Sequence, residues 1–378
     1  MISIPLSLYV HLPWCLQKCP YCDFNSHALK EALPEEAYIA ALQRDLQEEA
    51  HRVGSTSLVS IFFGGGTPSL FSARAFEKIL NEISHYFHLP SNIEITLEAN
   101  PSAIEQTRFK NYRALGINRI SLGIQSFNPH QLKKLGRAHD DVLAHEAIRA
   151  VMAAGFENFN LDLMHGLPDQ TFEEAIAELN TAFTYDPPHL SWYQLTLEPN
   201  TVFFKYPPSL PDEDHIAQWQ EAGLSLLKEK GYVHYEVSAY SKPGKQCAHN
   251  LHYWQFGDYL GIGAGAHGKW THPLTKIPTR RMKTRQPKDY LNLEKSCIAS
   301  ESTVPQKQQY FEFMLNALRL QHPIPWTLFE ERTQCHQKDL IPILKKLEQQ
   351  QLTEPSTEML QLSKKGRLFL DDVVSYFL

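Results

Sequence analysis

Short apolar runs alternate with longer amphipathic segments over the first 200 residues of the chain. Each run has the length and apolar content of a strand buried in a parallel sheet. The predicted strands are Leu6–His11, Leu58–Phe63, Ile93–Ala99, Arg119–Gly123, Asn158–Leu163 and His189–Leu195. The segments between them have helical length, and apolar residues recur in the first one at helical spacing. The predicted helices are Glu35–Val53, Ala73–Phe87, Ala103–Leu115, Val142–Ala154 and Thr171–Phe183.

This alternation predicts an α/β fold. Repeated strand–helix units form parallel sheets, and their right-handed crossovers curl such a sheet toward a barrel. Six units are too few to close an eight-stranded barrel, so we expect an open, partial (β/α)6 barrel. Functional groups in barrels of this kind collect at the carboxyl ends of the strands. The candidate residues below are weighed by that criterion.

The rest of the chain is less regular. We expect a helix over Asp214–Gly231, a strand over Tyr232–Tyr240, and a flexible loop or solvated face in the basic run 276–288. Amphipathic segments from Pro305 onward predict a small, mainly helical C-terminal domain with a winged-helix-like shape. The expected division is a core barrel over 1–235, a barrel extension over 236–304 and the helical domain over 305–378.

Composition and charge exclude several classes of function. The 378 residues carry a net charge of −6, and the C-terminal segment balances nine basic with nine acidic residues, so we expect no nucleic-acid partner. No apolar run is long enough to span a membrane, and the first residues lack the features of a signal peptide. We therefore expect a cytoplasmic protein. Six cysteines do not predict a disulfide scaffold there, and Cys247, Cys297 and Cys335 are interpreted as free thiols.

Three cysteines stand close together just after the first predicted strand. Cys15, Cys19 and Cys22 have C-x3-C-x2-C spacing on a loop that follows Pro13. Thiolates are the usual ligands of iron–sulfur clusters, and three of them can hold three irons of a 4Fe–4S cubane. The alternatives are three unrelated thiols, or a zinc site completed by a histidine such as His11 or His27.

A glycine-rich stretch follows the second predicted strand. Residues 64–69 read G-G-G-T-P-S, so the backbone there can approach a ligand closely. The stretch lacks the G-K-[ST] ending of a phosphate-binding loop, which argues against a nucleoside triphosphate.

Polar side chains mark the ends of the next three strands. Glu98 ends the third strand, Gln125 lies at the tip of the fourth, and Asp162 lies within the apolar fifth. A carboxylate in an apolar strand is costly to bury unpaired, so Asp162 requires a partner. Arg137 can pair with a carboxylate through its planar fork. The alternatives are a salt bridge at the rim for Glu98 and a solvated side chain for Arg137.

These residues resemble the radical-SAM superfamily. That family holds a 4Fe–4S cluster on a C-x3-C-x2-C loop, and the open iron chelates S-adenosylmethionine (SAM). The glycine stretch resembles the family's GGE-type motif, which implies backbone contacts to SAM at Gly65, Gly66 and Thr67.

One branch of the superfamily is matched more closely, namely the oxygen-independent coproporphyrinogen III oxidases and their relatives. The shared motifs are Y-x-H-x-P-x-C, GGGTPS, E-x-N-P, S-x-G-x-Q-S-F, L-x-R-x-H and D-L-x-x-G-L-P. The SAM contacts that the resemblance implies are Tyr9, Gly65, Gly66, Thr67, Glu98, Gln125, Arg137 and Asp162. A packed strand residue is the alternative for Tyr9.

Residues 249–254 read H-N-L-H-Y-W. By themselves these would be satisfied core residues, although His249 can ligate a haem iron and Tyr253 and Trp254 can pack on a porphyrin. The following run 261–268 fits G-x-G-x-x-A, but Pro273 follows and no helix is predicted to begin there, so a dinucleotide fold is not expected.

Two functions compete within this branch, the oxidative decarboxylation of coproporphyrinogen III and a haem chaperone. Three features favour the chaperones. The oxidases have a cysteine where this chain has Phe24, they have a longer N-terminal extension, and H-N-x-x-Y-W resembles the chaperones' haem-binding motif. We therefore expect a haem chaperone, without coproporphyrinogen oxidase activity, in which His249 contacts haem.

On this interpretation the ligands are a 4Fe–4S cluster, SAM and haem. The partners that the resemblance implies are haem-acceptor proteins, with those of a membrane respiratory chain as the suggested class. The sequence leaves three alternatives undecided: that the protein forms a homodimer, that it cleaves SAM, and that it catalyses another radical-SAM reaction such as methyl transfer. The candidates for a second haem ligand are His11, His139, His165, His252 and His267.

Overall fold

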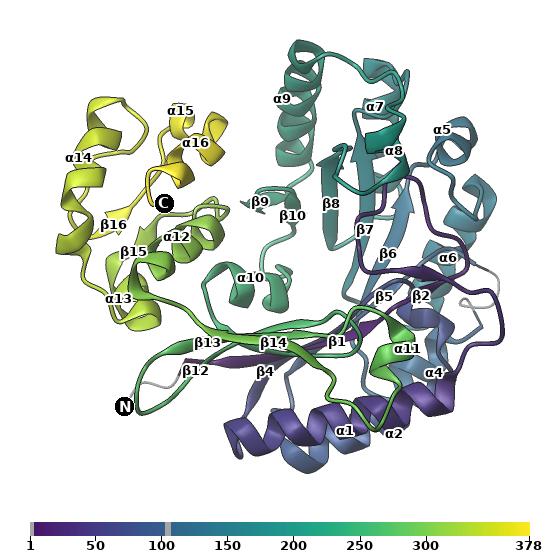
Figure 1. Ribbon diagram of the computed structural model, residues 1–378. Coiled ribbons are helices and arrows are strands. Elements are labelled where there is room, and N and C mark those ends of the chain that lie inside the picture. The colour runs from purple at the N-terminus through teal and green to yellow at the C-terminus, as the bar shows by residue number, and fades with distance from the viewer. Residues whose placement is uncertain (1–3, 103–106) are drawn as a thin grey trace.

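The computed structural model describes residues 4–102 and 107–378, with a 12-stranded sheet at its centre (Figure 1). The predicted α/β partial barrel is confirmed. The parallel strands of the six repeated units are β1 (Leu6–Leu12), β4 (Leu58–Gly65), β5 (Glu94–Ala99), β6 (Arg119–Gln125), β7 (Phe159–His165) and β8 (His189–Gln194). A seventh parallel strand, β11 (Asp258–Ile262), comes from the extension and lies beside β1.

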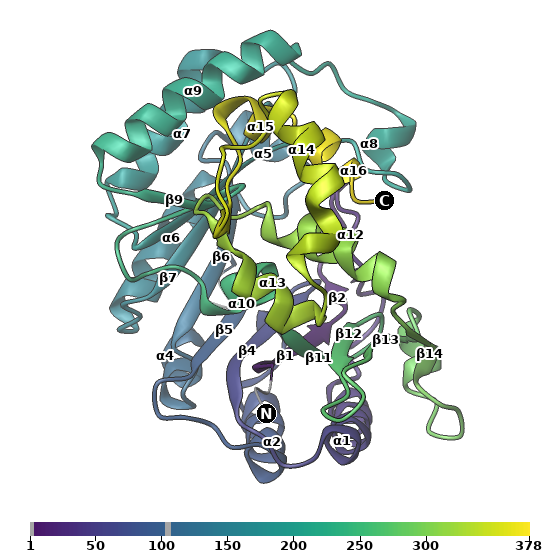
Figure 2. The same cartoon turned by 90° about the vertical axis from the view of Figure 1, so that its left-hand side faces the viewer.

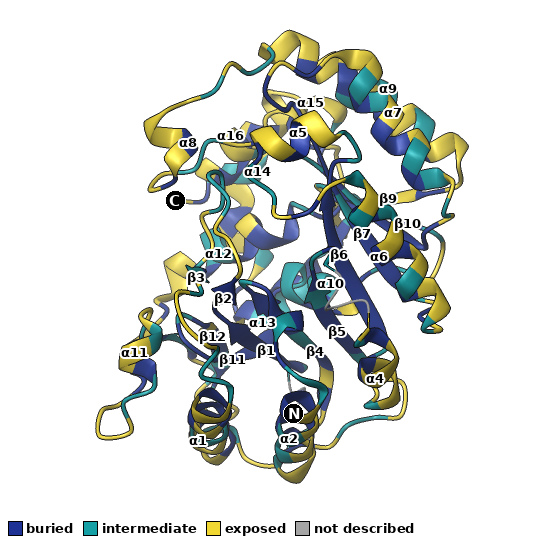
Figure 3. Cartoon of the chain, turned by 90° about the vertical axis from the view of Figure 1, so that its right-hand side faces the viewer, coloured by how far each residue is buried: buried dark blue, intermediate teal, exposed yellow. Residues whose placement is uncertain are grey.

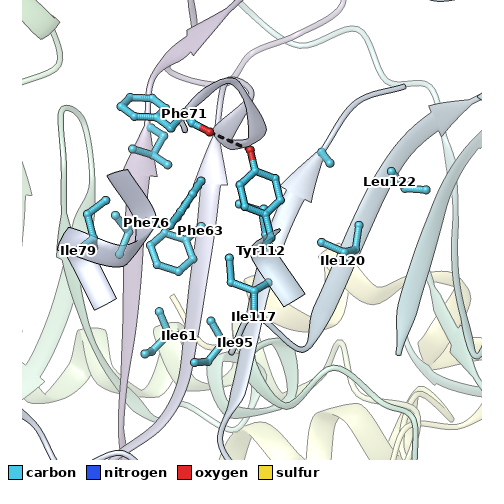
Figure 4. Close-up of a cluster of buried hydrophobic side chains, with 14 of the residues drawn as sticks. Ile61, Phe63, Phe71, Phe76, Ile79, Ile95, Tyr112, Ile117, Ile120 and Leu122 are labelled. Carbon is cyan, nitrogen blue, oxygen red and sulfur yellow. Dashed lines mark hydrogen bonds between the residues drawn. The ribbon is translucent and has the colours of Figure 1, made fainter. Parts of the chain in front are cut away.

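The crossover helices cover the outer face of the sheet. They are α1 (Glu35–Val53), α2 (Ala73–Tyr86), α4 (Phe109–Ala114), α6 (Asp141–Ala153) and α7 (Phe172–Phe183). The helix expected over 103–115 is described from 107 onward only, since 103–106 lie outside the described residues. Strand residues such as Ile61 and Phe63 pack against Phe76 and Ile79 of α2 in a shared apolar core (Figure 4). Figure 3 shows these strands as the most continuously buried elements.

The N-termini of three crossover helices are closed by polar side chains. Ser72 caps α2, Asp140 caps α6, and Thr171 forms a reciprocal capping box with Glu174 at α7. Caps of this kind satisfy backbone N–H groups that have no partner within the helix. They fix where each crossover begins, and hence where each strand ends.

The other face of the sheet carries α10 (Ala248–Trp254) and the C-terminal domain (Figure 2). The domain consists of α12 (Gln306–Ala317), β15 (Ile324–Pro325), α13 (Trp326–Thr333), α14 (Ile341–Gln349), β16 (Met359–Leu360), α15 (Lys364–Leu368) and α16 (Leu370–Ser375). It has an apolar core of its own. The Arg319 guanidinium lies 4.8 Å from the centre of the Trp254 ring and so joins the domain to α10.

Further elements, short except for α9, join these parts of the chain. They are β2 (Trp14–Cys15), β3 (His27–Ala28), the 3-10 turn η1 (Pro68–Leu70), α5 (Pro129–Lys134), α8 (Val202–Lys205), α9 (Glu213–Glu229), α11 (Pro287–Tyr290) and η2 (Gln337–Leu340). Among the residues that the structure describes, no helix combines the length and the apolar character needed to span a bilayer.

The strand expected over Tyr232–Tyr240 is wrong as a single element. The segment forms two antiparallel strands, β9 (Val233–Glu236) and β10 (Ala239–Ser241), joined by a turn at residues 237 and 238. The alternation of apolar and polar residues continues through this tight turn, so the pattern does not reveal that the strand ends there.

The basic run 276–288 is also neither a loop nor a solvated face throughout. It contains β13 (Pro278–Lys283), which lies between β12 (His267–Thr271) and β14 (Ile298–Thr303). The Lys283 ammonium pairs with Asp45 at 2.5 Å and with Glu49 at 2.7 Å, and all three side chains are buried. The two acids occupy the inward face of α1, and buried carboxylates require cations. This ion-pair cluster fastens the extension to the barrel.

Candidate functional site

The cysteine loop is held in place by backbone hydrogen bonds at its two ends. The His27 N–H donates to the carbonyl of Pro13 at 2.7 Å, and the Leu29 N–H donates to that of Cys15 at 2.9 Å. The loop therefore begins and ends at one place, directly after β1. Cys15, Cys19 and Cys22 are free thiols and line a single cavity of about 390 Å³ at the carboxyl ends of the strands.

The surroundings of these thiols fit a polynuclear cluster. Burial and the neighbouring Cys22 and Cys19 raise the pKa of Cys15 to about 11, so the thiolate needs a positive partner. A bound iron–sulfur core supplies that charge. In the described part of the chain, no three His, Cys, Asp or Glu side chains converge as a single-ion site requires.

The glycine stretch packs directly on the cysteine loop. The Gly66 N–H donates to the carbonyl of Leu12 at 2.9 Å, and the Thr67 N–H donates to that of Trp14 at 2.7 Å. A Cβ at Gly66 would lie 2.5 Å from the Trp14 carbonyl oxygen, and Gly65 has a φ of +126°. The glycines are therefore needed for the close approach of two protein segments, a requirement that the sequence did not reveal. Gly65, Gly66 and Thr67 also line the thiol cavity.

The polar strand-end residues converge on the same cavity. Glu98, Gln125, Arg137 and Asp162 all line it, together with the three thiols. Gln125 ends β6 in the left-handed region, with a φ of 68°, and accepts a hydrogen bond from the Tyr193 hydroxyl at 2.6 Å. The structure thus brings together every predicted SAM contact except Tyr9.

Arg137 is held inside the site and is not solvated. Its Nη2 donates to the Asn100 side chain at 2.5 Å and to the Gly123 carbonyl at 2.8 Å, while Nη1 lies 3.7 Å from the Cys19 sulfur. Its Nε–H is buried and has no partner among the described residues. An unpaired buried donor is costly, so this group suits the carboxylate of a ligand.

Two carboxyl groups line the cavity, and a bound cation would favour their ionised forms. Asp162 has the partners it was predicted to need, since it accepts hydrogen bonds from Ser121 at 3.0 Å and Asn160 at 2.7 Å. Glu98 accepts the Gly65 N–H at 3.1 Å. Burial, followed by the charge of Asp162, raises the pKa of Glu98 to about 8. A ligand that carries both a carboxylate and a cationic centre fits this donor and acceptor set, and SAM is such a molecule.

Several residues of the cavity were missed from the sequence. Tyr193, Ser121 and Asn100 line it and fix the predicted groups. All three lie in or directly after strands of the barrel. The strand-end criterion reaches Tyr193 near the tip of β8, whereas Ser121 and Asn100 lie within the motifs S-x-G-x-Q-S-F and E-x-N-P but were assigned no role.

A second cavity, of about 530 Å³, adjoins the first. The two share the wall residues Phe24, Gly65 and Glu98, and the second is also lined by Tyr9, Tyr253, Tyr259 and His249. The Tyr9 hydroxyl bonds to His11 Nδ1 at 2.9 Å, and His11 Nε2 bonds to the Asn25 carbonyl at 2.9 Å. Tyr9 therefore borders the second cavity and does not line the thiol cavity.

His249 is oriented by contacts from two strands. Its Nδ1 bonds to the Ser60 hydroxyl at 2.9 Å, and the Phe62 ring centre lies 5.0 Å away. The Glu94 carboxylate accepts the backbone N–H groups of Ala248 at 3.0 Å and His249 at 3.1 Å, which caps α10.

The imidazole of His249 is suited to a metal. Burial lowers its pKa to about 3, so the ring is neutral. Its Nε2 makes no hydrogen bond within the described chain, and the residue lines the cavity. A neutral imidazole fixed through one nitrogen presents the other as a ligand. Trp254 does not line this cavity, since it packs under Arg319.

Comparison with known families agrees with this geometry. The model of the radical SAM superfamily matches residues 9–181, and that of the HemN C-terminal domain matches residues 304–369. The solved structure of HemN, the coproporphyrinogen III oxidase of Escherichia coli, has a TM-score of 0.82 at 21% identity and covers 99% of this chain and 90% of its own. That likeness shows a shared fold.

Relatives that match this chain over nearly its full length show to which branch of the superfamily it belongs. The heme chaperone HemW of Haemophilus influenzae is 49% identical, covering 99% of this chain and 98% of its own. HemW of Escherichia coli is 46% identical over 99% of this chain and 98% of its own. HemW of Bacillus subtilis is 32% identical over 98% of this chain and 99% of its own. The superfamily implies a 4Fe–4S cluster and SAM, which the thiol cavity fits, and the chain belongs to the HemW family.

Proposed function

We propose that this protein is a haem chaperone that binds haem in the second cavity and delivers it to acceptor haem proteins. The observation that carries the proposal is the neutral imidazole of His249, held by Ser60 with its Nε2 free, in a cavity bordered by aromatic rings. Haem iron is commonly held by a histidine, and aromatic side chains pack well on a porphyrin. The names of the HemW relatives support the same function.

The thiol cavity supplies the second part of the proposal. Cys15, Cys19 and Cys22 would hold a 4Fe–4S cluster, whose open iron binds SAM. Arg137 would bind the SAM carboxylate, while Glu98 and Asp162 would favour its cationic centre. Because Glu98 and Gly65 line both cavities, ligand bound in the first stabilises a wall of the second. SAM binding therefore prepares the haem cavity.

The test is anaerobic and uses the full chain with its cluster reconstituted. Haem and coproporphyrinogen III are offered separately, each with SAM and a reductant. We expect one haem to bind per chain and no protoporphyrinogen to form. Turnover of coproporphyrinogen III would contradict the proposal and establish the oxidase activity instead.

Two histidine variants locate the haem. His249→Ala is expected to weaken haem binding and to leave the cluster's absorption intact, because His249 lies outside the thiol cavity. His130→Ala is the matched control, since this exposed histidine lines neither cavity. An unchanged haem titration in His249→Ala would remove this residue from the site.

A further inference from the structure

The haem cavity contains one more histidine, His267, which the proposed function does not use. The residue begins β12 and lines the cavity together with His249. Its ring makes no hydrogen bond to any residue that the structure describes. The residue as a whole is exposed, and partial burial of its ring, with Arg280 and Arg285 nearby, lowers the pKa of His267. A neutral imidazole is the form that binds metals.

The other candidate histidines are engaged elsewhere. Both ring nitrogens of His11 are hydrogen-bonded. Nε2 of His252 bonds to a backbone carbonyl at 2.7 Å, and Nε2 of His139 bonds to another at 3.1 Å. His165 is buried against an indole ring at 4.3 Å. His252, His139 and His165 do not line the cavity, which leaves His267 as the one candidate with an available ring.

The sheet places His267 two strands away from Tyr9, which also lines the cavity. Phe62, Tyr9 and Gly261 are in register across β4, β1 and β11. The backbone of His267 lies directly against Gly261, where a Cβ would come within 2.0 Å of the His267 carbonyl oxygen. His267 in turn pairs with Met282 of β13, which also lines the cavity.

These observations assign His267 a role. We propose that His267 is the second axial ligand of the haem iron, so that haem is held between α10 and the β12 strand of the extension. This inference rests on the proposed haem site at His249. It also explains why the extension is fastened to the barrel by buried ion pairs, because its position sets that of a ligand.

The spin state of ferric haem tests the inference. Haem is bound to the full chain with its cluster reconstituted, and its coordination is followed by electron paramagnetic resonance and by resonance Raman with Soret excitation. We expect six-coordinate, low-spin haem in the unaltered protein. His267→Ala should give five-coordinate, high-spin haem with affinity reduced at least roughly tenfold, the scale on which even outer partners change metal binding. Free imidazole should restore the low-spin signal.

Two further variants make the result specific. His130→Ala is the control for loss of an exposed histidine, and Met282→Leu tests the thioether in the same cavity. Unchanged low-spin haem in His267→Ala, or loss of the sixth ligand in Met282→Leu alone, would overturn the inference. High-spin haem in the unaltered protein would also overturn it, although the haem site would stand. If the unaltered protein binds no haem, or His249→Ala binds it normally, the proposed function fails as well.

Discussion

The two adjoining cavities are built in different ways. The thiol cavity is lined mainly by one continuous series of strand–helix units, in which each functional group lies at or near a strand end. The second cavity combines β1, α10 and the β12–β13 hairpin, and its lining residues Tyr9 and Met282 are 273 residues apart in the chain. Its key residue, His249, is positioned by Glu94 and Ser60 from two different strands. The first site thus depends on local motifs, and the second depends on long-range contacts.

The largest effect is expected when one of the three thiols is removed from the first cavity. Cys19→Ala removes one of three proposed cluster ligands, and a cubane held by two cysteines has lost its anchor. We expect the broad visible absorption of the reconstituted cluster to disappear. Haem binding should persist with reduced affinity, because His249 and its contacts do not involve the cysteine loop, whereas the wall that the two cavities share loses the support of bound SAM.

Cys335→Ala is the matched control, since this buried thiol lies in the core of the C-terminal domain. A full 4Fe–4S spectrum in Cys19→Ala would refute the cluster assignment. Loss of haem binding together with the cluster would show that the two cavities are not separable.

The next largest effect is expected from a residue that positions His249 without lining the second cavity. Glu94→Gln removes the charge that accepts two N–H groups at the start of α10. Hydrogen bonds to a charged group contribute about 2 kcal/mol, so we expect haem affinity to fall roughly thirtyfold. The cluster's spectrum and the affinity for SAM should stay unchanged, because Glu94 does not line the thiol cavity.

Glu77→Gln, on the exposed face of α2, controls for the loss of one negative charge. Chemical denaturation separates positioning from general destabilisation, because the buried Arg119 guanidinium also lies near Glu94. Lower stability with unchanged haem affinity would mean that Glu94 does not position His249.

The same difference explains what the sequence could predict. Strand–helix periodicity predicted the barrel, and contiguous motifs predicted the three cysteines and seven further residues that line the thiol cavity, although Tyr193, Ser121 and Asn100 were missed. The ion pairs of Lys283 and the cap of α10 by Glu94 were not predictable, because they join segments more than 150 residues apart. Tyr9 was assigned to SAM by its motif, but the structure places it in the neighbouring cavity. A motif selects a candidate residue, whereas the cavity which that residue lines depends on the fold.

A smaller effect is expected from Glu98, which lies in the wall that the two cavities share. Burial raises the pKa of Glu98 to about 8, above its value in the unfolded chain. Between these two pKa values the folded state binds the extra proton, so stability falls as the pH rises from about 4.5 to about 8. Glu98→Gln removes this loss. Because Glu98 faces an open cavity, we expect the SAM-free variant to gain only about 1–2 kcal/mol over the unaltered protein at pH 8.

Urea denaturation at pH 5 and at pH 8 measures this difference. The gain should be close to zero at pH 5, where Glu98 is protonated in the folded state. A gain of equal size at both pH values would mean that the substitution acts through packing and not through titration.

The smallest effect is expected from the hydrogen bond that orients His249 in the second cavity. Ser60→Ala removes the hydrogen bond that fixes the His249 ring through Nδ1 at 2.9 Å. We expect haem affinity to fall roughly fivefold, since one neutral hydrogen bond contributes about 1 kcal/mol. In the His267→Ala background, where the haem is five-coordinate, the iron–histidine stretching band in resonance Raman spectra of ferrous haem should also shift, because the partner of Nδ1 tunes the ligand. Ser225→Ala, exposed on α9, is the control. An unshifted band would mean that Ser60 does not orient the ligand, and that Glu94 and Phe62 hold His249 without it.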